Sequence, residues 1–207
     1  MTRIQEPPRD FDQLALVTVD VDPSELLRIA WAGEETHLRF TRRARYRFDA
    51  PNGEYGVLYA AFDLTTAFVE TVLRDNPRRS RAGGAVILDH SELVQRRVIQ
   101  LTYGKDARPL RLVKLYDEGL AAAHTDNQIA SRDHYPTTQR WSQAFHMPAI
   151  QADGILYMSR YIGSTRSVVI FDRAKDHLAR GSVTHLLEHA DLPGILDQFQ
   201  LGIDKPS

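Results

Sequence analysis

The chain has 207 residues, of which 43% are hydrophobic and 26% charged, and its formal net charge is −1. This composition is ordinary for a globular protein, and the balanced charge gives no general attraction to nucleic acid or an anionic membrane. The absence of cysteine excludes disulfides, thiolate nucleophiles and cysteine-bound metal sites. We expect a cytoplasmic protein, because no apolar run approaches the ~20 residues of a membrane helix and no secretory signal is recognisable.

The first half of the chain is predicted to contain short strands and one longer helix. We take residues 1–20 as an N-terminal arm with a short helix at 11–16, and residues 21–207 as one domain. Asp63 is a good N-cap for a helix over 64–74, because its side chain can accept a bond from a first-turn amide. Asn76-Pro77 should end that helix. Strands are predicted over 26–31 and 56–61, a polar connection over 34–43 and a loop over 78–84.

The second half reads as further strands with two helices between them. Strands are predicted over 85–89, 98–102, 110–116, 154–159 and 167–171, helices over 119–123 and 137–146, and a mostly helical tail after them. Strands outnumber long helices and do not alternate regularly with them. The predicted class is therefore α+β, a single domain with mixed or antiparallel sheets and flanking helices.

Three side chains in the segment 45–70 stand out for their chemistry. Arg47 lies in a loop, Tyr59 ends a short apolar strand, and Glu70 lies on the following helix. A cation, an aromatic face and a carboxylate are thereby brought together from neighbouring elements. This set suits a ligand with a phosphate, a flat cationic ring and a ribose, and NAD has all three.

Each of these residues also has an ordinary structural interpretation. Glu70 could be an exposed side chain paired with Arg74 one helical turn away, which stabilises a helix by a few tenths of a kcal/mol. Arg47 belongs to a basic cluster that could simply be solvated, and a tyrosine in an apolar strand is most often core. No single residue decides between the two interpretations.

The order and spacing of these residues resemble the RES domain family, which is named for characteristic Arg, Glu and Ser residues. Arg28 in Leu-Leu-Arg-Ile, Arg47 in Arg-Phe-Asp, Tyr59 in Val-Leu-Tyr and Glu70 in Ala-Phe-Val-Glu match its motifs. The late segments 153–160 and 167–171 resemble its serine-bearing strand pair. The family serine is then Ser159, with Ser142, which follows Trp141, as the second candidate. The resemblance spans roughly residues 26–172.

The resemblance implies a fold like that of ADP-ribosyltransferase toxins and an activity that consumes NAD. Such proteins are typically the toxin halves of bacterial toxin–antitoxin pairs, and they cleave NAD by hydrolysis or phosphorolysis. NAD is then the substrate, and neither a cofactor nor a metal is expected. The expected partner is an antitoxin, often with a helix-turn-helix domain, so that nucleic acid is contacted only through it. Mono-ADP-ribosylation of a protein target and formation of a homo-oligomer both stay open.

The residue types fit cleavage of the nicotinamide–ribose bond, which leaves positive charge on the ribose. Glu70 is expected to bind the ribose and to stabilise that charge. Arg47 and Arg28 would hold the diphosphate, and Tyr59 would offer its face to the nicotinamide ring. Ser159, or Ser142, would hydrogen-bond the ligand. The sequence supplies no strong nucleophile, so water or phosphate would attack.

Two rival functions belong to other classes. Residues 39–47 hold five arginines interleaved with Phe40 and Tyr46, a pattern that can bind nucleic-acid phosphates. An inactive protein-interaction module is the second rival. His185 and His189 are four residues apart, but without a His-Glu-x-x-His motif they do not predict a metal site.

Overall fold

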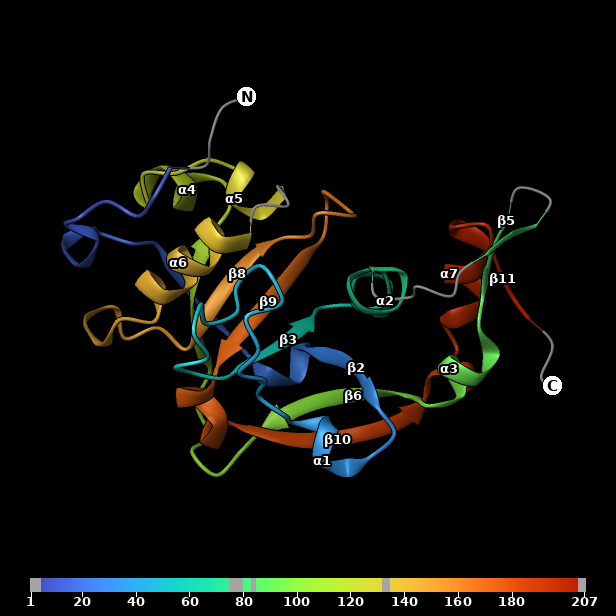
Figure 1. Cartoon of the computed structure of the whole chain (residues 1–207). Coiled ribbons are helices and arrows are strands. Elements are labelled where there is room, and N and C mark those ends of the chain that lie inside the picture. The colour runs from blue at the N-terminus through green and yellow to red at the C-terminus, as the bar shows by residue number, and fades with distance from the viewer. Residues whose placement is uncertain (1–4, 75–79, 83–84, 132–134, 205–207) are drawn as a thin grey trace.

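The computed structural model describes residues 5–74, 80–82, 85–131 and 135–204. Within these ranges, eight strands form one large sheet in the order β1-β7-β8-β9-β3-β2-β6-β10, and three form a small sheet in the order β11-β5-β4. Helices flank both sheets, as Figure 1 shows, and the predicted α+β class is confirmed. None of the helices in the described ranges has both the length and the apolar character needed to cross a membrane.

The large sheet is antiparallel except where β7 runs parallel to β8, and in the small sheet β11 runs parallel to β5. The strands of the large sheet are β1 Thr18–Val21, β2 Leu27–Trp31, β3 Val57–Ala61, β6 Arg96–Tyr103, β7 Leu110–Leu115, β8 Gly154–Met158, β9 Arg166–Phe171 and β10 Leu178–His185. Those of the small sheet are β4 Ser80–Ala82, β5 Ala85–Leu88 and β11 Leu201–Ile203.

The helices are short, with one exception. They are α1 Glu34–His37, α2 Leu64–Phe68, α3 His90–Val94, α4 Glu118–Ala122, α5 Gln128–Ser131, α6 Tyr135–Phe145 and α7 Leu192–Gln198. Single 3-10 turns lie at Phe11–Gln13, Pro23–Glu25, Pro148–Ile150, Asp172–His177 and Leu186–Glu188, and a π-helical turn, η3, covers Val69–Leu73.

Apolar side chains cover both faces of the large sheet. On one face α6 buries Trp141 and Phe145 against Phe11 and the central strands β8 and β9. On the other face, leucines from β6 and β10 pack against leucines from β7 and β8, although these strands are far apart in the sheet order. The sheet must therefore curve strongly, so that its two ends enclose this second cluster.

The sheet nearly splits between its neighbouring strands β2 and β3. Only one residue pair, Leu27 with Ala61, is in register between them among the described strands. Beyond that pair β2 continues along β6, whereas the edge of β3 is taken by a single bridge between Val57 and Thr41. The two strands therefore diverge, and the space between them becomes important for the site.

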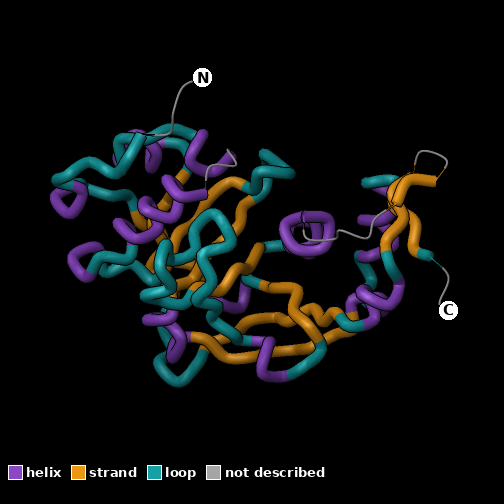
Figure 2. Tube along the Cα trace, viewed as in Figure 1, coloured by secondary structure: helices purple, strands orange, loops and turns teal. Residues whose placement is uncertain are grey.

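A third apolar cluster connects the small sheet to the rest of the molecule. Phe68 and Val72 are fully buried against Leu88 of β5 and Leu192 of α7. In Figure 2 the helix that follows β3 accordingly lies between the large sheet and the small one near the C-terminus. Burial of such side chains contributes about 1.5–3 kcal/mol each, so this cluster fixes the helix that carries Glu70.

The predicted mostly helical tail is confirmed only in part: it contains α7 and two 3-10 segments, but residues 178–185 form the eight-residue strand β10. Its side chains are mainly polar and exposed, as on an edge strand with one neighbour, and its register shifts between Arg180 and Val183. A polar, bulged edge strand has no apolar run for sequence reasoning to detect.

Smaller differences concern the connections. The predicted polar connection 34–43 contains the short helix α1, in which His37 is buried. Part of the predicted loop 78–84 is strand β4, while its other residues, like Asn76 and Pro77, lie outside the described residues.

The described part of the predicted N-terminal arm is packed against the domain. Its helix is a single turn at Phe11–Gln13, shorter than predicted, and Phe11 lies in the core. The indole Nε1 of Trp141 donates to the carbonyl of Gln5 over 2.7 Å. Residues Thr18–Val21 then enter the large sheet as β1, so the arm and the domain share one fold.

Candidate active site

Glu70 is positioned by the helix that begins at Asp63. As predicted, Asp63 caps this helix: its carboxylate accepts from the backbone amide and the hydroxyl of Thr66 at 2.7 and 2.8 Å. After Phe68 the helix continues as the π-helical turn Val69–Leu73. A π turn is rare and recurs at functional sites, because its extra residue re-aims the side chains that follow. Here it contains Glu70.

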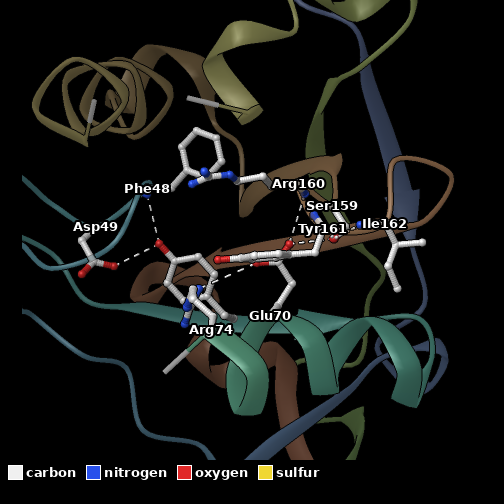
Figure 3. A network of polar contacts seen from close by, with 9 residues as sticks. Phe48, Asp49, Glu70, Arg74, Ser159, Arg160, Tyr161 and Ile162 are labelled. Carbon is white, nitrogen blue, oxygen red and sulfur yellow. Dashed lines mark hydrogen bonds and ion pairs between the residues drawn. The ribbon is translucent and has the colours of Figure 1, made fainter. Parts of the chain in front are cut away.

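The Glu70 carboxylate is held from two sides (Figure 3). Its Oε1 accepts from the hydroxyl of Ser159 over 2.7 Å and from the backbone amide of Arg160 over 3.3 Å. Its Oε2 lies 3.8 Å from the guanidinium of Arg74. The Glu70 side chain is only 16% exposed. The structure thus holds this carboxylate in one orientation while leaving part of it open to a cavity.

Ser159 comes from the end of β8, 89 residues away in the chain. It is 2% exposed, and its hydroxyl oxygen accepts from the backbone amides of Tyr161 and Ile162, both at 3.3 Å. Since a hydroxyl has one proton and two lone pairs, these contacts direct its proton toward Glu70. Ser159 therefore contacts the predicted glutamate, as expected of two residues in one site.

Tyr59 is fixed by the loop that carries Arg47. Its hydroxyl donates to Asp49 and accepts from the amide of Phe48, both at 3.0 Å. The other carboxylate oxygen of Asp49 accepts from the amides of Arg45 and Tyr46. Burial raises the pKa of both Asp49 and Tyr59. Tyr59 therefore stays neutral, and its ring is held as a rigid wall of the site.

Arg47 is 9% exposed and reaches the other side of the same space. Its Nη1 donates to the carbonyl of Ile129 over 3.2 Å, and its guanidinium lies 5.6 Å from the ring centre of Tyr135. Such a contact between a cation and a ring face is favourable. Helices α5 and α6 thus help to aim this cation.

Three cavities meet around these residues. The smallest, about 20 Å³, is lined by Arg47, Tyr59 and Glu70 together with Arg74, Tyr135, Tyr157, Arg160 and Tyr161. The predicted trio therefore shares one cavity. A second, of about 30 Å³, is lined by Glu70, Tyr59, Arg74 and, from β2, Arg28. Glu70 consequently connects the two small cavities.

The third cavity is the largest, at about 250 Å³, and occupies the gap between the diverging strands β2 and β3. Arg28, Tyr59 and Arg74 line it as well, so it continues the second cavity. The rest of its charged and aromatic wall consists of Trp31, Arg39, Arg43, Arg45, Tyr46, Asp49 and Arg96. The three cavities form a row with Glu70 toward one end and this arginine-rich space at the other.

Arg28 lies in the middle of the row and has unsatisfied donors. Its Nε and Nη1 are buried, yet no acceptor among the described residues bonds them. Burial lowers the pKa of Arg28 to about 10, so the group is still a cation at neutral pH. An unpaired buried charge is costly, and buried polar groups are almost always bonded. Both nitrogens belong to a side chain that lines the two larger cavities of the row.

Ser142 differs from the other predicted site residues. It is fully buried in α6 and lines none of the three cavities. Its hydroxyl donates to the carbonyl of Phe48 over 2.6 Å and lies 2.8 Å from the hydroxyl of Tyr55. In the structure Ser142 anchors the loop next to Arg47.

Several cavity residues were not among the predicted site residues. Arg74 lines all three cavities and lies 4.2 Å from the ring centre of Tyr46. Its position four residues after Glu70 on one helix was the only sequence signal, and it indicated an ordinary surface pair. Asp49 directly follows the Arg47-Phe48 pair, but its buried bond to Tyr59 gives no sequence pattern.

Comparison with known proteins identifies the family of this chain. The family model of the RES domain matches residues 25–193, and the chain belongs to the RES domain family. Among curated proteins it is similar to "Probable toxin y4kH" of Sinorhizobium fredii (strain NBRC 101917 / NGR234), with 32% identity over 97 residues, which cover 46% of this chain and 76% of that protein.

Among solved structures the chain is similar to the crystal structure of the M. tuberculosis MbcT–MbcA toxin–antitoxin complex. The TM-score is 0.61 at 15% sequence identity, and the match covers 92% of this chain and 94% of the matched chain. At this identity the likeness is one of fold. It agrees with the α+β fold expected from the sequence.

Proposed function

We propose that this protein is an enzyme that degrades NAD⁺ by cleaving the bond between nicotinamide and ribose. The observation that carries this proposal is the row of cavities in which the fixed carboxylate of Glu70 shares a cavity with Arg28, whose buried Nε and Nη1 have no acceptor among the described residues. The Glu70 carboxylate suits a ribose with oxocarbenium character, and the Arg28 guanidinium suits a diphosphate. Both groups belong to one dinucleotide.

Glu70 would act on the ribose. As the C1′–N bond breaks, its electron pair leaves with nicotinamide, which becomes neutral, and positive charge spreads over C1′ and the ring oxygen. A carboxylate that is already oriented by Ser159 and Arg160 stabilises this charge without reorganising. Water or phosphate then bonds to C1′ and gives up a proton, so that free ADP-ribose or its 1″-phosphate is formed.

The remaining side chains would bind and orient the substrate. Arg28 would donate to the diphosphate, which satisfies the two buried nitrogens that lack an acceptor. Arg47 lies at the Glu70 end of the row and would contact the nicotinamide side of the diphosphate. The ring of Tyr59 lines all three cavities, and a stacking contact with the cationic nicotinamide contributes about 0.5–2 kcal/mol.

We also propose that the protein is the toxin of a toxin–antitoxin pair and acts in the cytoplasm. Support comes from its membership of the RES family, from its similarity to a protein named as a probable toxin and from its fold. The partner would be an antitoxin that covers the cavities and contacts DNA through its own helix-turn-helix domain.

Mass spectrometry of the products tests the enzymatic proposal. The purified protein is incubated with NAD⁺ with and without inorganic phosphate, and the Glu70→Gln variant is the control. Free ADP-ribose indicates hydrolysis, its 1″-phosphate indicates phosphorolysis, and a mass gain on a protein indicates transfer. Intact NAD⁺ in every sample, with the wild-type protein folded, contradicts the proposal.

A further inference from the structure

The arginine-rich cavity carries more positive charge than a diphosphate needs. Six arginines line it. Two of them are already compensated: Arg96 is bonded to Glu92 at 2.7 Å, and Arg74 lies 3.8 Å from Glu70. The other four guanidinium groups have no carboxylate partner among the described residues, namely those of Arg28, Arg39, Arg43 and Arg45.

The single carboxylate in this wall does not offset them. Asp49 accepts from two backbone amides and from Tyr59, and burial raises its pKa. The neighbouring Arg42 offers a contrast, since it is paired with Asp172 at 2.6 Å and does not line the cavity. Within one short segment, the arginine outside the cavity is neutralised and those in its wall are not.

The order of the cavities indicates which part of a bound dinucleotide would lie near the excess positive charge. If the nicotinamide ribose is at Glu70 and the diphosphate at Arg28, the adenosine half extends into the 250 Å³ cavity. Arg39, Arg43 and Arg45 are exposed residues that line this cavity and neither of the two smaller ones. Trp31, which is 47% exposed and has the Arg96 guanidinium 3.6 Å above its ring, offers a flat surface for a base there.

We propose that this end of the cavity binds a third phosphate group, on the adenosine ribose, so that a 2′-phosphorylated dinucleotide is bound more tightly than NAD⁺ itself. This inference rests on the proposed function for the direction in which the dinucleotide lies. A phosphomonoester carries about −1.5 to −2 charge at pH 7 and three acceptor oxygens, which match the unpaired guanidinium groups. A diphosphate alone would satisfy Arg28 and leave the three exposed arginines without a role.

Two adenosine ligands that differ only in this phosphate test the proposal without turnover. The affinities of adenosine 2′,5′-bisphosphate and 5′-AMP are measured by calorimetry at one salt concentration, because charge contacts weaken as salt rises. We expect the 2′-phosphate to tighten binding about tenfold. Equal affinity of the two ligands for the wild-type protein would overturn the proposal.

Single substitutions test whether the tighter binding of the bisphosphate comes from the arginines of the cavity wall. Arg43→Ala and Arg45→Ala should each reduce the preference for the bisphosphate several-fold, whereas Arg42→Ala, which removes a guanidinium from the same segment outside the cavity, should leave it unchanged. A loss of equal size in Arg42→Ala would mean general charge attraction and would refute the site. Thermal melting of each variant checks that it is folded.

Turnover of NADP⁺ and NAD⁺ separates this inference from the proposed function. A higher kcat/KM with NADP⁺ than with NAD⁺ supports both the proposed function and the third-phosphate site. Turnover of NAD⁺ alone, with no gain from the 2′-phosphate in the binding assay, overturns only the third-phosphate site. Absence of turnover with either dinucleotide contradicts the proposed function, while the binding assay still decides whether the 2′-phosphate is recognised.

Discussion

The two ends of the row of cavities are built in opposite ways. At one end the Glu70 carboxylate is held by Ser159, Arg160 and Arg74, and the space left is small. Toward the other end, Arg28 has two buried donors for which the described part of the chain supplies no acceptor, and the cavity is more than ten times larger. The first arrangement is typical of a group that must be oriented before reaction, and the second of a site that is completed by its ligand.

The two ends of the row also differ in what they cost the stability of the folded protein. A fully bonded network around Glu70 costs little stability and needs no rearrangement when charge develops. An unsatisfied buried cation costs about 1–3 kcal/mol or more, which the folded protein must offset elsewhere. Substitutions at the Glu70 end should therefore change mainly kcat. Substitutions at the Arg28 end should change mainly KM and the free energy of unfolding.

The largest effect is expected at the Glu70 end. Glu70→Gln keeps the shape and the bonds from Ser159 and Arg160 but removes the negative charge. We expect kcat for NAD⁺ cleavage to fall about 10²–10³-fold, since a preorganised electrostatic group contributes about 3–4 kcal/mol. Nicotinamide release measured by chromatography gives the rate. A variant with wild-type melting temperature and nearly wild-type turnover would remove Glu70 from the mechanism.

The next largest effect is expected at Arg28, in the middle of the row. Arg28→Met removes the charge-assisted bonds to the diphosphate, so kcat/KM should fall about 10–100-fold, mainly through KM. The same change removes two buried donors that have no acceptor within the described ranges, so the free energy of unfolding should rise by about 1 kcal/mol. Denaturant unfolding and steady-state kinetics measure the two effects. Arg42→Met is the matched control, because Arg42 is exposed, and it should change neither quantity much.

A smaller effect is expected at Ser159. Ser159→Ala removes one donor to Glu70 and leaves the amide of Arg160 in place. We expect kcat to fall about tenfold, because one hydrogen bond to a charged group contributes about 1.5–3 kcal/mol at most. Ser91→Ala, which removes a hydroxyl from helix α3 outside the three cavities, is the control. A loss as large as that of Glu70→Gln would mean that Ser159 itself contacts the reacting atoms.

Trp31 should affect binding only modestly. Trp31→Ala removes the flat surface at the rim of the large cavity, and KM should rise about 3–10-fold from the loss of a stacking contact. Trp31→Phe keeps an aromatic face and should recover most of the affinity. An unchanged KM in both variants would place the adenine elsewhere in the cavity.

The smallest effect on turnover is expected at Ser142. Ser142→Ala leaves the carbonyl of Phe48 and the hydroxyl of Tyr55 without their buried partner. The free energy of unfolding should fall by about 1–3 kcal/mol, while kcat/KM stays within about twofold. Denaturant unfolding and NAD⁺ kinetics on one preparation measure both. A loss of turnover without a loss of stability would indicate that Ser142 contacts the ligand after all.

Sequence reasoning succeeded where one local pattern was enough. The cap at Asp63, the apolar strand β3 that contains Tyr59 and the glutamate on the next helix all lie close together in the chain. Motif order then placed Arg28 and Ser159 in the same site, and the structure brings both to it. The roles of these residues in catalysis stay predictions.

What sequence reasoning missed depends on long-range geometry. The large cavity exists because β2 and β3 share one residue pair and then diverge, which neither strand encodes alone. Likewise, the basic segment 39–47 suggested a nucleic-acid surface, yet Arg42 pairs with Asp172 while its neighbours line a cavity. Which way each arginine points is decided by β3 and by the turn after β9, far away in the sequence.

A crystal structure of the Glu70→Gln variant with NAD⁺ tests most directly the claim that one dinucleotide spans both ends of the row. Because this variant is expected to cleave slowly, the substrate should stay intact. We expect a ribose hydroxyl of the bound NAD⁺ beside residue 70, and its diphosphate hydrogen-bonded to Nε and Nη1 of Arg28. A dinucleotide bound elsewhere, or one whose diphosphate leaves those nitrogens unbonded, would contradict it.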